Sequence, residues 1–284
     1  MRLGIGLPPN PDPLQLVETA RLAEAASFSS VGLLDRLVHD NPDSLITLAG
    51  IATATSRIRI QTEVLLAPLR ETAWLAKQAA TLDRLSGGRF TLGLGVGGRS
   101  DDYVAAGQAY GQRGKRMDQQ LDLLKRIWAG ETFVEGAGPV GPLPLTPGGP
   151  EILFGAFAPA ALERIARWGD GILAAGPASY TAHLFATVRA GWQAAGRAGQ
   201  PKLVGQINVG IGDAASVAET RERLIRYYGL GQPYTDQALA SLITDAATLR
   251  DTIQAFEEIG TDELMLYTWA HDPAQVRRLA DAVR

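Results

Sequence analysis

The sequence predicts an α/β protein that is built as a (β/α)8 TIM barrel. Short apolar runs recur along the 284 residues, and segments with helical spacing of apolar residues lie between them. Alternation of strand and helix favours a parallel sheet, and eight such units favour closure of that sheet into a barrel. The length suits a single domain over residues 1–284, because α/β barrels run to about 250 residues.

Each predicted strand is a short apolar run, and none of these runs continues with the spacing of a helix. They are Leu3–Leu7, Val31–Leu34, Ile58–Val64, Phe90–Leu94, Ile152–Phe154, Ile172–Ala174, Val204–Ile211 and Leu264–Tyr267. In the third unit Leu75, Ala79 and Leu82 form a helical face, and the Gly87-Gly88 pair supplies a left-handed stop. In the fourth unit the equivalent face is Met117, Leu121, Leu124 and Trp128, with Gly130 after it.

Two segments interrupt this rhythm. Residues 131–150 contain ten Gly or Pro, so neither a helix nor a strand is predicted there. This segment follows the fourth helix, which places its ends at the N-terminal end of the barrel. Residues 229–244 contain Gly231, Pro233 and Tyr234 and are also predicted to be irregular. They follow the seventh strand–helix unit and could cover the C-terminal end of the barrel. Either of the two segments could act as a lid.

Composition excludes several functional classes. The chain is 46% hydrophobic and 20% charged, as is typical of a globular protein with a large core. A net charge of −3 gives no electrostatic basis for binding nucleic acid or an anionic membrane. With no cysteine, disulfides, thiolate nucleophiles and cysteine-ligated metals are excluded. The histidines His39, His183 and His271 are too far apart for a spacing-defined metal site, and no metal is expected. No run reaches membrane-span length, so we expect a cytoplasmic protein.

The active face of a parallel barrel is formed by the C-terminal ends of the strands and the loops after them. The second strand ends in Asp35 and Arg36, followed by His39. Because the first charge follows the buried run directly, a ligand-contacting cluster is favoured over a solvated loop with an ion pair.

The third strand ends near Glu63, which interrupts an apolar run. A buried carboxylate is unfavourable unless it is paired. Arg70, just before the next helix, could pair with it. Alternatively, Glu63 faces away from its neighbours on the other side of the strand.

The fourth strand ends in a glycine loop in which Gly93, Gly95 and Gly98 match the spacing of a dinucleotide-binding turn. That fold requires an acidic residue about twenty positions later. Here the region is Arg113–Gln120, a helix start rich in Arg and Lys, so the dinucleotide interpretation is rejected. Glycines such as Gly95 and Gly97 would instead admit a flat ring or a phosphate to the backbone. The alternative is that they relieve crowding inside the barrel.

Two further strand exits carry candidate ligand contacts. After the fifth strand, the small-residue loop of Gly155, Ala156, Phe157 and Ala158 precedes a helix that starts with proline, which suits phosphate or ring-edge binding or a plain turn. After the eighth strand, Trp269 and His271 suit a substrate or ring pocket. A catalytic base at His271 is the less favoured interpretation, because a His-Asp-Pro sequence more often begins a helix.

Taken together these motifs resemble the bacterial-luciferase-like superfamily, which includes flavin monooxygenases and enzymes that use the deazaflavin coenzyme F420. The resemblance implies an isoalloxazine ring bound across the barrel mouth and a non-proline cis bond at Glu63-Val64. It implies that Glu63, Val64, Gly95 and Gly97 lie at the cofactor and that Gly155 to Ala158 hold its ring or phosphate. It also implies a homodimer built on the second and third helices.

The chain departs from many of these relatives at one position. They have a catalytic histidine after the acidic residue that ends the second strand, and this chain has Arg36. Arginine stays charged and cannot shuttle a proton. A fixed cation could instead stabilise the anionic reduced ring.

The expected function is that of a flavin-dependent monooxygenase. Reduced FMN, supplied by a separate reductase, would react with O2 and a small organic substrate. Hydride transfer with coenzyme F420 is the first alternative, and a non-catalytic flavin-binding barrel is the second. A flavin-free lyase is disfavoured, because no strand exit offers a lysine. We expect Arg36 and Asp35 to be catalytic, and His39, Arg70, Trp269 and His271 to contact the substrate.

Overall fold

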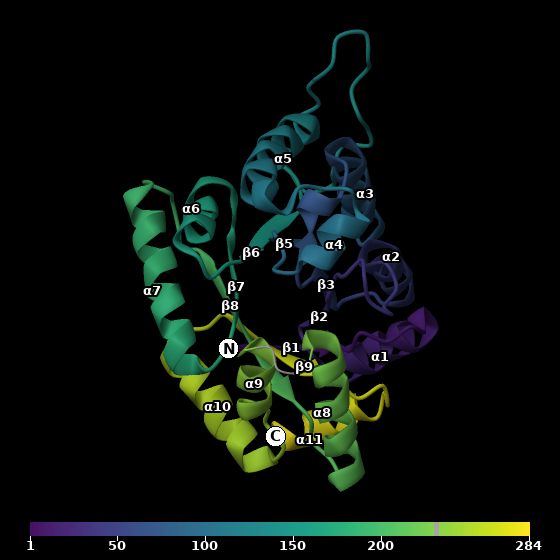
Figure 1. Ribbon diagram of the computed structural model, residues 1–284, viewed down its shortest axis with the longest axis vertical. Helices are drawn as coiled ribbons and strands as arrows, with labels where there is room; N and C mark the ends of the chain where they lie inside the picture. The colour runs from purple at the N-terminus through teal and green to yellow at the C-terminus, as the bar shows by residue number, and fades with distance from the viewer. Residues whose placement is uncertain (230–232) are drawn as a thin grey trace.

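A computed structural model describes residues 1–229 and 233–284 of the chain as a closed parallel β-barrel surrounded by helices (Figure 1). The strand order is β3-β2-β1-β9-β8-β7-β6-β5-β4, and an additional pairing of β3 with β5 closes the sheet. This confirms the predicted (β/α)8 class. The strands are β1 Arg2–Leu7, β2 Ser30–Leu33, β3 Arg59–Thr62, β4 Leu65–Leu66, β5 Phe90–Gly95, β6 Glu151–Gly155, β7 Gly171–Ala175, β8 Lys202–Val209 and β9 Glu263–Thr268.

The third barrel position is shared by two short strands. Both β3 and β4 pair in parallel with β5, and between them lies a cis peptide bond at Glu63-Val64. The continuous strand expected over Ile58–Val64 is therefore wrong in its C-terminal part. The cis bond implied by the family resemblance is present at the expected position.

The helices pack around the outside of the barrel. They are α1 Pro13–Ala25, α2 Ser44–Ala54, α3 Thr72–Leu85, α4 Ser100–Ala105, α5 Arg113–Trp128, α6 Pro159–Trp168, α7 Ala178–Ala194, α8 Ala214–Tyr228, α9 Pro233–Ala240, α10 Ala246–Glu258 and α11 Gln275–Ala282, with short 3₁₀ turns at Ala67–Leu69 and Tyr110–Gln112. The predicted faces of α3 and α5 are buried. Gly87 and Gly130 have φ of 65° and 84°, which confirms the left-handed stops.

The barrel interior contains polar groups as well as apolar ones. Its apolar cluster is formed by Leu153, Leu173, Val204, Met265 and Tyr267. Two glycines give large interior side chains their room. A Cβ on Gly6 would lie 2.2 Å from the Tyr267 ring, and one on Gly32 would lie 2.4 Å from Cδ of Glu63. The absence of side chains on β1 and β2 is thus what admits a phenol and a carboxyl group to the interior.

An excursion of two helices separates β8 from α10. After α8 and α9 the chain returns to the C-terminal end of β8, where Ile243 pairs with Val209. The prediction that residues 229–244 are irregular is wrong for Pro233–Ala240, which form α9. Pro233 is compatible with this helix because it is the first residue, where a missing N–H removes no helical hydrogen bond. Residues 230–232 of the predicted segment lie outside the described part.

Residues 131–150 contain no helix or strand, and Figure 1 shows the loop after α5 projecting past α5 and α3. The backbone N–H and the hydroxyl of Thr146 donate to the carboxylate of Asp83 on α3, at 2.7 and 2.9 Å. Lys77 of the same helix donates to the carbonyl of Gly141. The segment is therefore attached at the side of the barrel, away from the C-terminal ends of the strands.

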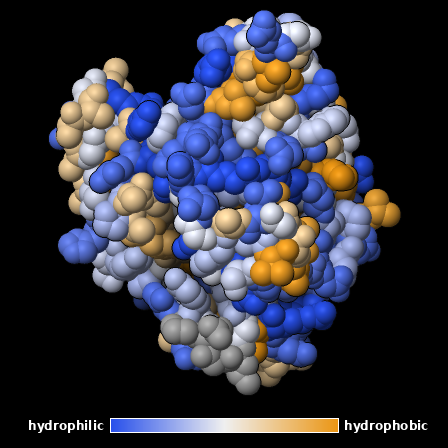
Figure 2. All heavy atoms as spheres, turned by 45° about the horizontal axis from the view of Figure 1, so that its top comes forward, coloured by the Kyte–Doolittle hydropathy of each residue, from blue (hydrophilic) through white to orange (hydrophobic). Residues whose placement is uncertain are grey.

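The outer surface is predominantly polar in the view of Figure 2, where apolar side chains form separate groups. Within residues 1–229 and 233–284, no helix is both long and apolar enough to span a membrane.

Candidate functional site at the barrel mouth

The barrel mouth, meaning the C-terminal strand ends and the loops after them, has Val64 in its floor. A Cβ on Gly95 would lie 2.4 Å from Val64 Cγ2, and one on Gly155 would lie 3.0 Å from Val64 Cγ1. The valine methyls therefore fill the space that side chains on β5 and β6 would need. For Gly95 the contacts support the interpretation that the glycine relieves crowding, and Gly155 has the same valine as its neighbour. The bare backbones bring three strand ends close together.

Glu63 points into the barrel interior, beneath this floor. Its side chain is only 3% exposed and lies over Gly32, and Gln61 donates to one carboxyl oxygen. The expected pairing with Arg70 is wrong, because Arg70 binds Asp35 and Asp43 instead. Burial raises the pKa of Glu63 to about 8, and the nearby Glu263 carboxylate acts in the same direction. Glu63 is therefore mostly protonated at neutral pH.

Asp35 joins the loop after β2 to the loop after β4. Its carboxylate accepts from the Leu66 N–H at 3.0 Å, the Ser44 hydroxyl at 3.2 Å and Arg70 Nη2 at 3.0 Å. Burial raises the pKa of Asp35, and the Arg70 guanidinium opposes that effect. The residue expected to be catalytic is thus fully engaged in holding two loops, and the expected substrate contact Arg70 is engaged with it.

Arg36 forms a buried ion pair with Asp102, which lies in the first turn of α4. Its Nε donates to Asp102 Oδ2 at 2.6 Å and its Nη2 donates to the Val38 carbonyl at 3.1 Å. The other Asp102 oxygen accepts the N–H groups of Leu37 and Val38. Arg36 is 8% exposed, and its Nη1 has no partner among the described residues. The cation proposed for the flavin is thus balanced by a carboxylate but keeps one free donor.

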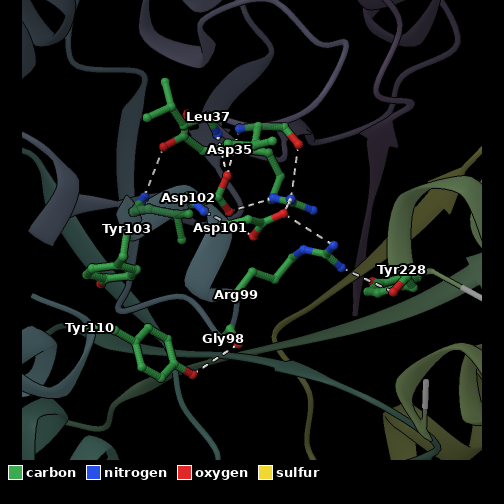
Figure 3. A network of polar contacts seen from close by, with 12 residues as sticks. Asp35, Leu37, Gly98, Arg99, Asp101, Asp102, Tyr103, Tyr110 and Tyr228 are labelled. Atoms are coloured by element: carbon green, nitrogen blue, oxygen red, sulfur yellow. Dashed lines mark hydrogen bonds and ion pairs between the residues drawn. The ribbon is translucent and has the colours of Figure 1, made fainter. Parts of the chain in front are cut away.

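A second arginine extends this network to α8. Arg99 donates to the carbonyl of Tyr228 at 3.2 Å and approaches Asp101 Oδ2 at 3.5 Å, and Asp101 also contacts Arg36 (Figure 3). Figure 3 shows Arg99 bridging from the acidic pair at the start of α4 to the C-terminal end of α8. The excursion after β8 is thereby attached to the loop after β5 across the mouth.

Aromatic side chains gather under α8. The Tyr227 ring lies 5.0 Å from that of His39 and 5.3 Å from that of Trp269, and 5.6 Å from the Arg36 guanidinium carbon. Trp269 is completely buried and donates through Nε1 to Asn208 at 2.9 Å. Burial raises the pKa of the Tyr228 phenol to about 12. The expected rim tryptophan is therefore the base of a water-poor aromatic cluster.

The loop after β6 is the open part of the mouth. Ala156 is buried, whereas Phe157 and Ala158 are exposed just before α6. Gly98 is exposed as well, and a Cβ built there meets no atom within 4 Å. Gly97 lies beside Leu66 of β4. This arc of the mouth offers bare backbone and small side chains to a ligand.

The structure thus brings Asp35, Arg36, His39 and Trp269 to one mouth, and places His271 beside α8. Sequence reasoning missed Asp102, Tyr227 and Tyr267 as members of this site. An Asp-Asp pair after a glycine loop was visible, but nothing in its spacing indicated that one carboxylate is buried under Arg36. Among the described residues no cluster of His, Asp and Glu could hold a metal ion.

Comparison with known proteins places this geometry in a family. The luciferase-like monooxygenase family matches residues 1–282. An uncharacterised protein of Mycobacterium tuberculosis is 30% identical over 196 residues, 66% of each chain. An F420-dependent glucose-6-phosphate dehydrogenase of Nakamurella multipartita is 32% identical over 211 residues, which are 65% of this chain and 60% of that protein. The chain spans under two thirds of the length of these curated relatives.

Solved structures agree in fold. A monooxygenase of Streptomyces bottropensis has a TM-score of 0.78 at 21% identity, covering 100% of this chain and 98% of its own. An F420-dependent secondary alcohol dehydrogenase has a TM-score of 0.79 at 18% identity, covering 100% and 99%. These likenesses concern the barrel fold. The chain belongs to the luciferase-like monooxygenase family.

Proposed function

We propose that this protein is a flavin-dependent monooxygenase that uses reduced FMN and O2 on a small organic substrate. The observation that carries the proposal is the asymmetric mouth. One arc is bare backbone above the Val64 floor, and the opposite arc is a buried aromatic cluster closed by α8. The first suits a planar ring and the second suits an apolar substrate in a water-poor space.

The residues of the open arc fit a flavin. Val64 would support one face of the ring, and the backbone at Gly95 and Gly97 would approach its edge. Gly155, Ala156, Phe157 and Ala158 would hold the ring or its phosphate, because the first N–H groups of α6 have no side-chain cap. The unpartnered Nη1 of Arg36 is a buried donor in need of an acceptor.

When bound, reduced FMN would supply the electrons and the site of O2 activation. The chain's own residues bind, orient and exclude water. Arg36 supplies a fixed donor but cannot move a proton. Trp269, Tyr227 and Tyr228 keep the substrate side poor in water, which protects reactive species from hydrolysis. Asp35 acts by holding the loops after β2 and β4 in register.

Hydride transfer with coenzyme F420 is the second candidate. It is favoured by sequence relatives whose names carry this cofactor, including a putative F420-dependent oxidoreductase of Mycobacterium tuberculosis that is 35% identical over 134 residues. Arg36 argues against one form of it, the oxidation of an alcohol, because that reaction releases a proton and a guanidinium cannot accept one.

Anaerobic titration with reduced FMN and, separately, with reduced F420 tests these alternatives. Tight FMN binding followed by an oxygen-dependent absorbance change is expected. Preference for F420 without an oxygen reaction would favour hydride transfer, and binding of FMN without turnover would indicate a non-catalytic barrel. If Arg36→Ala bound reduced FMN and turned over normally, the role of Arg36 would be rejected.

Two partners belong to the proposal. A separate reductase would supply reduced FMN, and a second copy of this chain would pack on α2 and α3. Ile46 on α2 and Trp74 on α3 are 74% and 66% exposed, which is unusual for large apolar side chains on adjacent helices. Light scattering of the wild type and of Trp74→Glu tests the dimer, which should dissociate in the variant.

A further inference from the structure

A small cleft lies beside the aromatic cluster, on the opposite arc of the mouth from the proposed flavin contacts. Its volume is about 60 Å³, and prolines of the β1–α1 loop form one wall. The other walls are His39 and Asp40 after β2, Arg223 and Arg226 on α8, and His271 after β9. Four separate segments therefore converge on one space of the size of a carboxylate or phosphate group.

The cleft carries two guanidinium groups and two neutral imidazoles. Arg223 Nη1 lies 2.7 Å from His271 Nε2, and the Pro9 carbonyl lies 3.3 Å from the same ring nitrogen. The shorter contact needs Nε2 to accept from the guanidinium, which favours the neutral imidazole. Burial and Arg223 lower the pKa of His271, the Pro9 carbonyl and Glu219 oppose them, and Arg226 acts in the lowering direction. Burial is thus the larger cause of the lowered pKa, and the two guanidinium groups act in the same direction.

His39 shows the same environment from the other wall. Both of its ring nitrogens are buried without a partner among the described residues. Burial lowers the pKa of His39, and Arg36, Arg226 and Arg99 act in the same direction against Asp40. A buried imidazole with two unpartnered nitrogens lacks the hydrogen bonds that such groups normally make.

The carboxylates near the cleft, Asp40 and Glu219, leave donors of Arg223 and Arg226 available to an anion. Asp40 lies 3.6 Å from Arg226, and both side chains are more than 60% exposed, so this surface pair contributes little. Glu219 binds Nε of Arg223 at 2.7 Å, and His271 contacts Nη1, so Nη2 is the nitrogen that neither of these partners occupies. An incoming anion can therefore compete for both guanidinium groups.

We propose that this cleft binds an anionic group of the substrate, a carboxylate or a phosphate, through Arg223, Arg226, His39 and His271. The inference rests on the proposed function, because it assigns a substrate class to the same mouth. The cofactor's own phosphate is the other source of such an anion. The strand order separates the two phosphate sites, since the cleft lies at the ends of β1, β2 and β9 and the loop proposed to hold the flavin phosphate follows β6.

The chain offers a direct readout, because it has three histidines and only two line the cleft. His183 is exposed on α7 and serves as an internal control. Histidine resonances of the full chain, recorded by NMR before any flavin is added, would be titrated with inorganic phosphate and with benzoate. An anion in the cleft should raise the pKa of His39 and His271 and leave His183 unchanged.

Arg226→Ala is the test variant, because its exposed side chain can be removed without leaving a buried gap. The affinity for phosphate or benzoate should fall at least tenfold. Arg221→Ala, an exposed arginine on the same helix, is the matched control and should bind as the wild type does. Equal effects in all three histidines, or equal loss in both variants, would overturn the site.

Comparison of FMN with riboflavin distinguishes the sources of the anion. If FMN shifted His39 and His271 and riboflavin did not, the cleft would belong to the cofactor and the substrate assignment would be overturned. The anion titration needs no flavin. A protein that fails to bind flavin would therefore overturn the proposed function, whereas a protein that fails to bind the anion would overturn only the cleft.

Discussion

Arg36 and Asp102 form a buried ion pair with Nε and Oδ2 2.6 Å apart, although 66 positions separate them in the sequence. The same carboxylate accepts the N–H groups of Leu37 and Val38. One side chain at the start of α4 therefore fixes both the cation and the backbone of the loop after β2. Charge pairing therefore holds Arg36 in place at the end of β2.

Removal of this carboxylate should be strongly destabilising. Asp102→Ala would leave Arg36 buried and charged with two backbone donors unpaired, and we expect a loss of about 3–5 kcal/mol in the free energy of unfolding. The matched control is Asp101→Ala, because that half-exposed carboxylate should contribute less than about 1 kcal/mol. Urea denaturation measures both. Equal losses in the two variants would contradict the role of Asp102.

Glu63→Gln should change the pH dependence of stability. Its pKa is about 8 in the folded chain against an ordinary value of 4.5. As pH rises, the Glu63 carboxyl group ionises in the unfolded chain before it ionises in the folded chain. Ionisation therefore favours the unfolded chain, and the wild type loses stability between about pH 4.5 and pH 8. Glutamine does not ionise, and the variant should gain on the wild type across this range, by up to about 4 kcal/mol.

Denaturation at pH 5 and at pH 8 measures this difference, with the exposed Glu222→Gln as control. A Glu63→Gln variant whose advantage is the same at both pH values would show that the carboxyl group ionises normally.

The floor of the mouth can be tested by a double-mutant cycle. Gly95→Ala would place a Cβ 2.4 Å from a Val64 methyl and should destabilise the chain by about 1–3 kcal/mol through overpacking. Val64→Ala removes that methyl, so the double variant should recover much of the loss. Thermal unfolding and reduced-FMN affinity are the measurements. Simple additivity of the two losses would mean that the residues do not compete for the same space.

Asp83→Ala should release the segment 131–150 from α3. The carboxylate accepts both hydrogen bonds of Thr146, and no replacement acceptor exists in alanine. Limited proteolysis should cut the variant within this segment much faster than the wild type. Because the segment is attached away from the mouth, flavin affinity should be retained. A large loss of flavin binding in a folded variant would show that the segment acts on the site.

The sequence by itself determined the barrel and the position of its mouth. Strand-forming runs, the buried faces of α3 and α5, and the stops at Gly87 and Gly130 are local patterns, and period and glycine conformation are sufficient to predict them. Asp35, Arg36 and His39 could be placed at the mouth because polar residues directly after a buried strand must emerge at its C-terminal end.

Only the tertiary structure decided which charges meet. Arg70 pairs with Asp35 and not with Glu63, because successive side chains of a strand point to opposite faces and Glu63 points inward. The burial of Trp269 depends on Tyr227 and Tyr228 of α8, which are far from it in the sequence. Ion pairs and burial of this kind involve residues that are far apart in the sequence. Tertiary packing decides which residues meet, and a local sequence pattern does not predict it.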